Sequence, residues 1–258
     1  MVAAVVHGFR ELRSPKVQEF IPLGFSVLVD RLKYLLRNTV ERFVQDNYEF
    51  ETRRKIVASE EGRDAAYWAQ LAELGILAAP FSEDHGGLGY GATETMVVME
   101  ELGKGLVVDP YFPTIVLGGG LLRNGGGAIA DEVIPSVAAG EDILAFAYAE
   151  PKGRFNLADL ETTAKADGGD YVINGHKAVV IGAPFATKLL VSARTSGGVR
   201  DENGVTVFVV DAKADGVSMR GYPTVDGLRA AEVYFENVKV PASNIVGELD
   251  NGLPLIEK

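Results

Sequence analysis

The apolar pattern of the chain changes its period near Gly140, and this change constrains the fold more than any other feature. Before Gly140, apolar residues recur every three or four positions, as in a helix with one buried face. After it, short β-branched and aromatic runs alternate with glycine turns, as in strands. We therefore expect the α+β class, with a helical domain over residues 31–140 followed by an antiparallel β-barrel-like domain over residues 141–258.

The first part of the helical domain has a clear apolar face and clear end signals. Asp64 is placed to cap a second helix that carries Trp68, and Gly75 provides a left-handed stop for it. The apolar face of the first helix consists of Leu32, Leu35, Leu36, Val40, Phe43 and Val44.

A third helix is marked by Met96, Met99 and Leu102 and is expected to end at Gly103. Residues at this spacing bury against neighbouring helices without needing a ligand. We therefore expect Trp68 and the two methionines to lie in the core.

The second part of the chain reads as a series of short strands. Asn174 and Gly175 are expected to break one extended run into two. The expected extended segments are Leu144–Ala149, Thr162–Ala166, Tyr171–Ile173, Lys177–Ile181, Leu189–Ala193, Val205–Asp211 and Ala231–Phe235.

Composition excludes several classes of function. A net charge of −11 argues against nonspecific binding of nucleic acid, for which a basic surface supplies most of the affinity. The chain has no cysteine, and its 3 histidines show no zinc spacing, so no metal site is expected. No apolar run approaches the ~20 residues of a membrane span. A cytoplasmic protein is expected, with residues 1–30 as a loosely packed leader of unknown structure.

Two glycine-rich stretches are weak signals for phosphate binding. Gly86-Gly87-Leu88-Gly89 follows no strand that leads into a helix, and a tight loop explains it better. Gly118–Gly120 and Gly125–Gly127 lack both the dinucleotide fingerprint and the Walker lysine. We expect local flexibility there rather than a nucleotide site.

Several tracts of the sequence resemble the acyl-CoA dehydrogenase family. They include Ala-Glu-Pro at 149–151, Tyr-Val-Ile-Asn-Gly-His-Lys at 171–177 and Val-Ser-Ala-Arg at 191–194. Further similar tracts, in the same order as in the family, are Leu74–Ile76, Asp84–Gly89, Glu100–Gly103, Val233–Pro241 and Ile245–Glu248. The resemblance covers roughly residues 32–252 and implies the family's helical N-terminal domain and β-barrel middle domain.

The resemblance also implies what the chain is expected to lack. In the family, a C-terminal helical bundle supplies the catalytic carboxylate, much of the acyl-CoA contact and most of the subunit interface. We expect that bundle to be absent, so no catalytic residue is assigned. Four carboxylates outside it, Glu150, Asp84, Asp226 and Glu232, are expected to be hydrated or ion-paired.

By the resemblance, the positions that contact the flavin are Phe146, Tyr148, Ala149, Val179 and Ile181. The family carries a hydroxyl at positions 149 and 181 and an indole at 179, and the residues here offer no hydrogen-bonding side chain in their place. Phe155 stands where a serine faces the acyl-CoA. Arg154 and Lys152 beside it are expected to be surface charges.

The resemblance implies α,β-desaturation of an acyl-CoA thioester with hydride transfer to FAD. Because of the changed positions, FAD is expected to bind weakly or to be shared with a partner, in a homo- or hetero-oligomer with another acyl-CoA dehydrogenase subunit. Two alternatives stay open: a non-catalytic scaffold subunit of a heteromeric dehydrogenase, and a related flavin oxidase or monooxygenase. The sequence does not indicate the electron acceptor.

Overall fold

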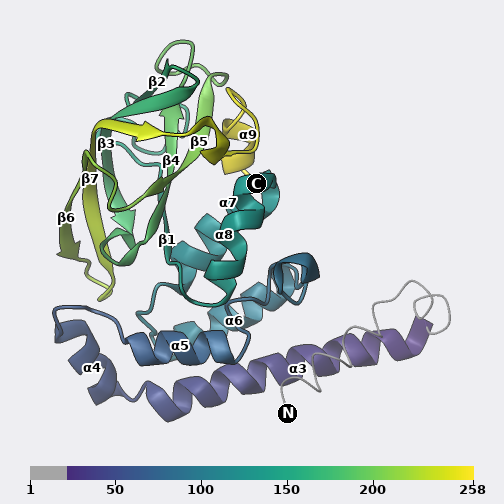
Figure 1. Cartoon of the computed structure of the whole chain (residues 1–258). Helices are drawn as coiled ribbons and strands as arrows, with labels where there is room; N and C mark the ends of the chain where they lie inside the picture. Colours follow the sequence, from purple (N-terminus) through teal and green to yellow (C-terminus); the bar gives the residue numbers. More distant parts are fainter. Residues whose placement is uncertain (1–21) are drawn as a thin grey trace.

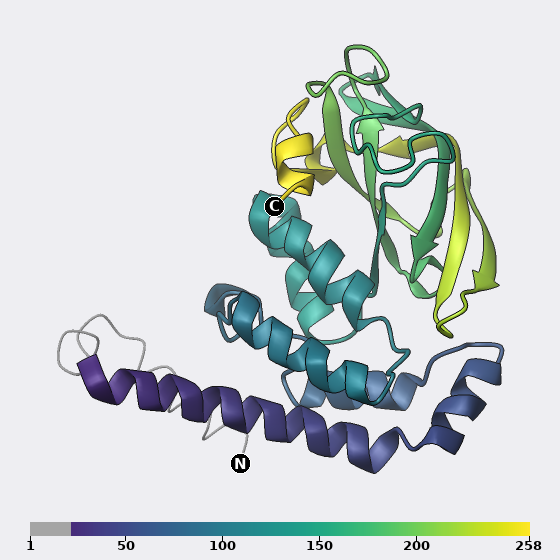
Figure 2. The same ribbon diagram turned by 180° about the vertical axis from the view of Figure 1, so that it is seen from behind.

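Helices form the first half of the protein and a curved sheet forms the second half (Figure 1). A computed structural model describes residues 22–258. Figure 2 shows α7 and α8 standing between the strands and the remaining longer helices. The helices are α3 (Pro22–Asn47), α4 (Phe50–Ala58), α5 (Ala65–Glu73), α6 (Ala92–Lys104), α7 (Gly119–Gly125), α8 (Ala128–Ala138) and α9 (Leu253–Ile256), with a π-helical segment η2 (Phe112–Gly118) before α7.

The first helix is longer than the apolar pattern predicts. α3 begins at Pro22, so the loosely packed leader expected for residues 1–30 does not extend over residues 22–30; residues 1–21 lie outside the described residues. Val40, Phe43 and Val44 are buried as expected, whereas Leu35 is 40% exposed. The buried stripe of α3 is therefore narrower than the sequence suggests.

The second helix has the ends that the sequence predicts. The Asp64 side chain accepts hydrogen bonds from the backbone N–H groups of Ala66 and Tyr67, which have no partner within the helix. Gly75 follows α5 with a φ of 71°, a conformation that costs a glycine nothing. Trp68 is buried, and its indole N–H donates to the Gly140 carbonyl at 3.0 Å.

The expectation that Met96 lies in the core is wrong. Met96 is 58% exposed, because α6 buries a neighbouring face that includes Val97, Val98 and Leu102. Glu101 shares that buried face, where its carboxylate pairs with Arg37 and Lys104. Three- and four-residue spacing thus found the helix, but the face that α6 buries includes Glu101 and leaves Met96 outside.

The glycine-rich stretches serve the packing of the helices. Gly86 and Gly89 have positive φ values of 77° and 62° in the tight loop around η1 (Glu83–His85). Gly118 and Gly119 lie against Leu144 and Phe81, so close that an added Cβ would come within 2.6 and 2.8 Å of those side chains. The latter stretch is therefore closely packed rather than loose.

The strands form one mixed sheet. Its strand order is β6-β7-β3-β2-β4-β5-β8, with β1 beside β4. Most neighbours are antiparallel as expected, but β1 runs parallel to β4, and Thr163 pairs with Arg194 in parallel. The strands are β1 (Leu144–Ala147), β2 (Thr163–Asp167), β3 (Asp170–Ile181), β4 (Lys188–Arg194), β5 (Val205–Asp211), β6 (Val217–Pro223), β7 (Arg229–Val240) and β8 (Ile245–Val246).

The break expected at Asn174 and Gly175 is instead an irregularity inside one strand. β3 runs continuously, and its pairing with β7 shifts register between Ile173 and Gly175. Gly175 is needed at this point because an added Cβ would lie 2.3 Å from the Thr162 hydroxyl. A bulge bends a strand without ending it, so turn-forming residues here mark a bend.

Two arginines join the helical part to the β6–β7 hairpin. Arg53 of α4 donates to the carbonyls of Leu106 and Asp226 at 2.7 and 2.8 Å. Arg229 at the start of β7 donates to the carbonyls of Val57 and Ser59 at 3.1 and 2.9 Å. The hairpin is thus tied to the end of α4.

Replacing Arg229 with methionine is expected to lower the free energy of unfolding by about 1–2 kcal/mol, because two hydrogen bonds between the two parts are lost. Urea unfolding measures this loss. Arg220→Met, on the exposed side of β6, is the control and should change stability by less than about 0.5 kcal/mol. Equal effects of the two substitutions would show that the Arg229 contacts contribute nothing.

Candidate functional site

The chain after β1 and the second half of β3 lie side by side and form an exposed apolar surface. The Ala178 N–H donates to the Ala149 carbonyl at 2.8 Å, which brings Tyr148 and Ala149 next to Val179 and Ile181. We call these four residues the wall. Tyr148 is 38% exposed and Val179 53%, while Ala149 and Ile181 are half-buried. Four of the five positions predicted to contact a flavin are thus accessible together.

The other two predicted residues are placed differently. Phe146 is buried, with its ring 5.0 Å from the ring of Tyr148, so it supports the wall from behind. Phe155 is fully exposed in the loop after Pro151, so no described residue packs over it. In the same loop, Lys152 pairs with Glu161 at 2.9 Å, which agrees with a surface charge.

Val179 has an unusual backbone. Its φ is 52°, in the left-handed region, which is an outlier for a β-branched residue. The pairing of β3 with β7 shifts register between Lys177 and Val180, so Val179 bulges out of the ladder. The most exposed residue of the wall is therefore also a strained one.

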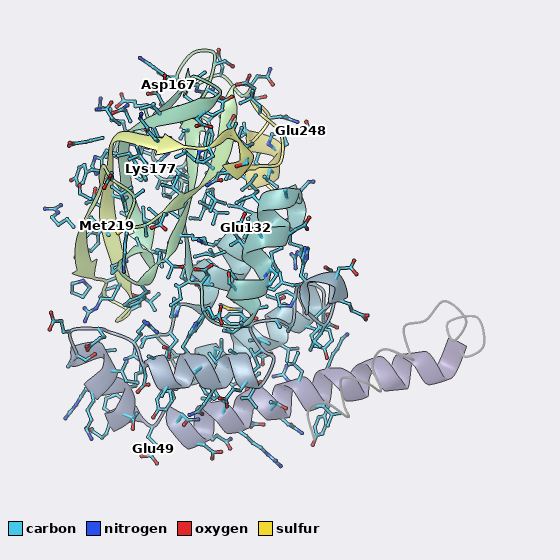
Figure 3. The ribbon with its side chains drawn as sticks, in the orientation of Figure 1. Glu49, Glu132, Asp167, Lys177, Met219 and Glu248 are labelled. Carbon is cyan, nitrogen blue, oxygen red and sulfur yellow. The ribbon has the colours of Figure 1, made fainter. Side chains whose placement is uncertain are left out.

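A buried ion pair lies close to the wall. The Lys177 ammonium is 2.8 Å from the Glu150 carboxylate, and it also donates to the Tyr148 carbonyl and the Ser192 hydroxyl. Lys177 is completely buried, and Figure 3 marks it inside the strand domain. The other Glu150 contacts are the backbone N–H groups of Glu161 and Thr162, at 2.6 and 3.1 Å.

The protonation of this pair follows from burial and from the partner charge. Burial lowers the pKa of Lys177 to about 8, against the opposite influence of Glu150. Burial raises the pKa of Glu150, but the Lys177 charge and the hydrogen bonds outweigh it and hold that pKa below its usual value. Glu150 is therefore a charged structural group, as the sequence suggested, and is not free to take a proton.

Sequence reasoning missed a second polar group beside the wall. His176 Nε2 lies 2.5 Å from Glu232, and the Tyr222 hydroxyl donates to the other oxygen of Glu232 at 3.3 Å. The His176 ring stacks on Tyr234 with the centroids 4.3 Å apart. His176 and Glu232 are far apart in sequence, so only the pairing of β3 with β7 brings them together.

A surface cavity of about 580 Å³ borders this group. It lies between the loop after β1, the chain entering β2 and the bulge of β3, and its lining residues are Glu150, Pro151, Lys152, Glu161, Thr162, Gly175 and His176. Its ionisable side chains have partners: Lys152 pairs with Glu161, Glu150 with Lys177, and His176 with Glu232. The cavity therefore presents no free charge for an anion or a cation.

Residues 22–258 contain neither a cluster of candidate metal ligands nor a helix suited to a membrane. Within that range, no three histidine or acidic side chains gather as metal ligands do. None of the helices described there is long and apolar enough to cross a bilayer.

The sequence matches two consecutive family descriptions over most of its length. Residues 33–141 match the N-terminal domain of acyl-CoA dehydrogenases, and residues 145–238 match the middle domain. The chain belongs to the acyl-CoA dehydrogenase family. Helical and strand parts thus follow the order that the sequence predicted.

Individual relatives agree with this assignment. The mitochondrial isovaleryl-CoA dehydrogenase of Pongo abelii is 30% identical over 227 residues, which are 84% of this chain and 53% of that protein. The ChsE4-ChsE5 complex from Mycobacterium tuberculosis contains a chain with a TM-score of 0.76 and 26% identity, covering 88% of this chain and 58% of that one.

The FAD complex of PigA shares the fold, with a TM-score of 0.78 at 22% identity over 86% of this chain and 60% of that one. The chain spans about half the length of the curated relatives it matches.

Proposed function

We propose that the chain is a flavin-dependent acyl-CoA dehydrogenase subunit that binds FAD weakly or together with a partner subunit. The wall is the observation that carries the proposal. Tyr148 and Val179 offer exposed apolar surface against which a planar ring can pack. Ala149 and Ile181 offer no side-chain hydrogen bond, so the polar edge of a ring meets mainly backbone groups.

In this proposal the bound FAD accepts a hydride from the β-carbon of an acyl-CoA thioester. The chain contributes the surface that orients the ring and excludes water from one side of it. A residue that removes the α-proton is not found among the described carboxylates beside the wall, because Glu150 is held by Lys177 and Glu232 by His176. We therefore place the catalytic base outside these residues, in keeping with a shared site.

In this proposal, a partner subunit of the same family supplies the catalytic base, while this chain supplies one surface of the flavin site. A relative of known structure is described as the ChsE4-ChsE5 complex, which is an assembly of two different proteins. The second candidate function, a scaffold subunit that binds no flavin, is favoured by the absence of a side-chain hydroxyl from both Ala149 and Ile181. Flavin content distinguishes the two candidates.

The purified chain is expected to reduce no electron-accepting dye with any acyl-CoA, and to gain activity when its co-expressed partner is present. An absorbance spectrum of each sample reports flavin content. A yellow complex with a colourless isolated chain supports the shared site, while flavin bound only by the partner supports the scaffold. Turnover by the isolated chain that Glu232→Gln abolishes would show that the base has been misplaced.

A further inference from the structure

Two of the four wall residues follow the end of a strand ladder. The parallel pairing of β1 with β4 ends at Ala147, so Tyr148 and Ala149 come after the last ladder position. Their carbonyls are bound from β3, where the Ala178 N–H donates to the Ala149 carbonyl at 2.8 Å. The Lys177 ammonium donates to the Tyr148 carbonyl at 3.3 Å. The position of this segment therefore depends on a side chain as well as on the backbone.

The same ammonium holds the next residue of the segment. The Glu150 carboxylate lies 2.8 Å from the Lys177 ammonium, and it also accepts from the N–H groups of Glu161 and Thr162 where the chain enters β2. The third partner of the ammonium is the Ser192 hydroxyl of β4, at 3.2 Å. An ammonium has three donors, so Lys177, completely buried and with three partners, is fixed in one position.

These contacts connect the two halves of the wall. Lys177 lies two positions before Val179 in β3, and its ammonium reaches across to the segment that carries Tyr148. Without that bond, Tyr148 and Ala149 would be free to shift relative to Val179. A binding surface has to hold its groups to within about 0.5 Å, so a small shift of one half changes the fit of a planar ligand.

We propose that Lys177 is a positioning residue of the wall, whose ammonium holds the Tyr148 carbonyl and the Glu150 carboxylate and so sets where Tyr148 and Ala149 stand relative to Val179. The ligand that senses this spacing is the flavin ring, and in this respect the inference rests on the proposed function. Lys177 itself is completely buried and acts on the ring only through the segment that it holds.

Removing the ammonium without leaving an unpaired carboxylate tests the proposal. The double variant Glu150→Gln with Lys177→Met is expected to weaken FAD binding about tenfold in the complex with the partner, measured by quenching of flavin fluorescence. Ser192→Ala is the matched control, because it removes a hydrogen bond from the same ammonium but none from the wall. The control should change FAD affinity less than about twofold. Circular dichroism confirms that both variants are folded.

Restoring an ammonium by chemistry gives a rescue test. The chain has no cysteine, so the single thiol of Lys177→Cys can be alkylated with bromoethylamine in the unfolded state. The alkylated side chain is as long as that of lysine and ends in an ammonium. After refolding, the alkylated protein should bind FAD within about threefold of wild type that was unfolded and refolded in the same way. A refolded, alkylated protein that binds no better than the double variant would contradict the proposal.

Amide hydrogen exchange of Ala178 in the flavin-free protein reports how firmly the segment is held. Its protection factor is expected to fall about tenfold in the double variant and to stay unchanged in Ser192→Ala. The positioning role is overturned by wild-type FAD affinity in the folded double variant, by an equal loss in Ser192→Ala, or by unchanged Ala178 protection, while FAD binding by the wild type keeps the proposed function. If the wild type binds no FAD in any setting, the proposed function fails, and Ala178 protection alone decides whether Lys177 holds the segment.

Discussion

Replacing Lys177 with methionine is expected to lower the free energy of unfolding by about 3–5 kcal/mol, because it leaves the buried Glu150 carboxylate without its counter-charge. The two backbone N–H groups that Glu150 retains cannot offset a charge that has lost its partner. Urea unfolding followed by circular dichroism measures the change.

Two control variants test whether the loss of stability comes from an unpaired charge at a buried position. Lys152→Met removes an exposed partner of Glu161 and should cost less than about 1 kcal/mol, as surface pairs generally do. The double variant Glu150→Gln with Lys177→Met should recover part of the lost stability, since the remaining amide is neutral. A double variant less stable than Lys177→Met would contradict the view that an unpaired charge causes the loss.

Restoring polar and aromatic groups to the wall is expected to tighten FAD binding by about 1–3 kcal/mol, or roughly tenfold to a hundredfold. The variant combines Ala149→Thr and Ile181→Thr, which add hydroxyls, with Val179→Trp, which adds stacking area. The hydrogen bond between Ala178 and Ala149 holds the two segments in a fixed register, so both hydroxyls should face the same side.

Quenching of flavin fluorescence measures FAD binding by the parent and by the triple variant. Each protein is measured alone and together with the partner. Val172→Thr is the control, because it adds a hydroxyl to the same strand away from the wall. A folded triple variant that binds FAD no better in either setting would show that these positions do not face the ring. The scaffold function would then be the better account.

Local signals in the sequence predicted local structure well. The strand Val205–Asp211 has the expected bounds, and Asp64 and Gly75 end α5 as their chemistry requires. Each of these features depends on residues within a few positions of one another. Short-range sterics and hydrogen bonding therefore largely decide them, without reference to distant parts of the chain.

Features that depend on distant pairing could not be predicted in the same way. Alternation along a strand indicates which side faces the core, but it does not name the neighbouring strand, so the parallel pairing of β1 with β4 was missed. For the same reason, nothing in the sequence joined His176 to Glu232. Resemblance to a family singled out the four residues of the wall, whereas the pairing of His176 with Glu232 is visible only in three dimensions.

The alternation of β3 has a consequence for how such a chain can change over evolutionary time. Lys177 points into the core, and Val179, two positions later, is displaced outward by the bulge. Substitutions at exposed Val179 are therefore expected to disturb folding less than substitutions at buried Lys177. A duplicated gene could lose the hydroxyls of the wall step by step while its product remained a stable, recognisable member of the family, free to specialise beside a copy that kept them.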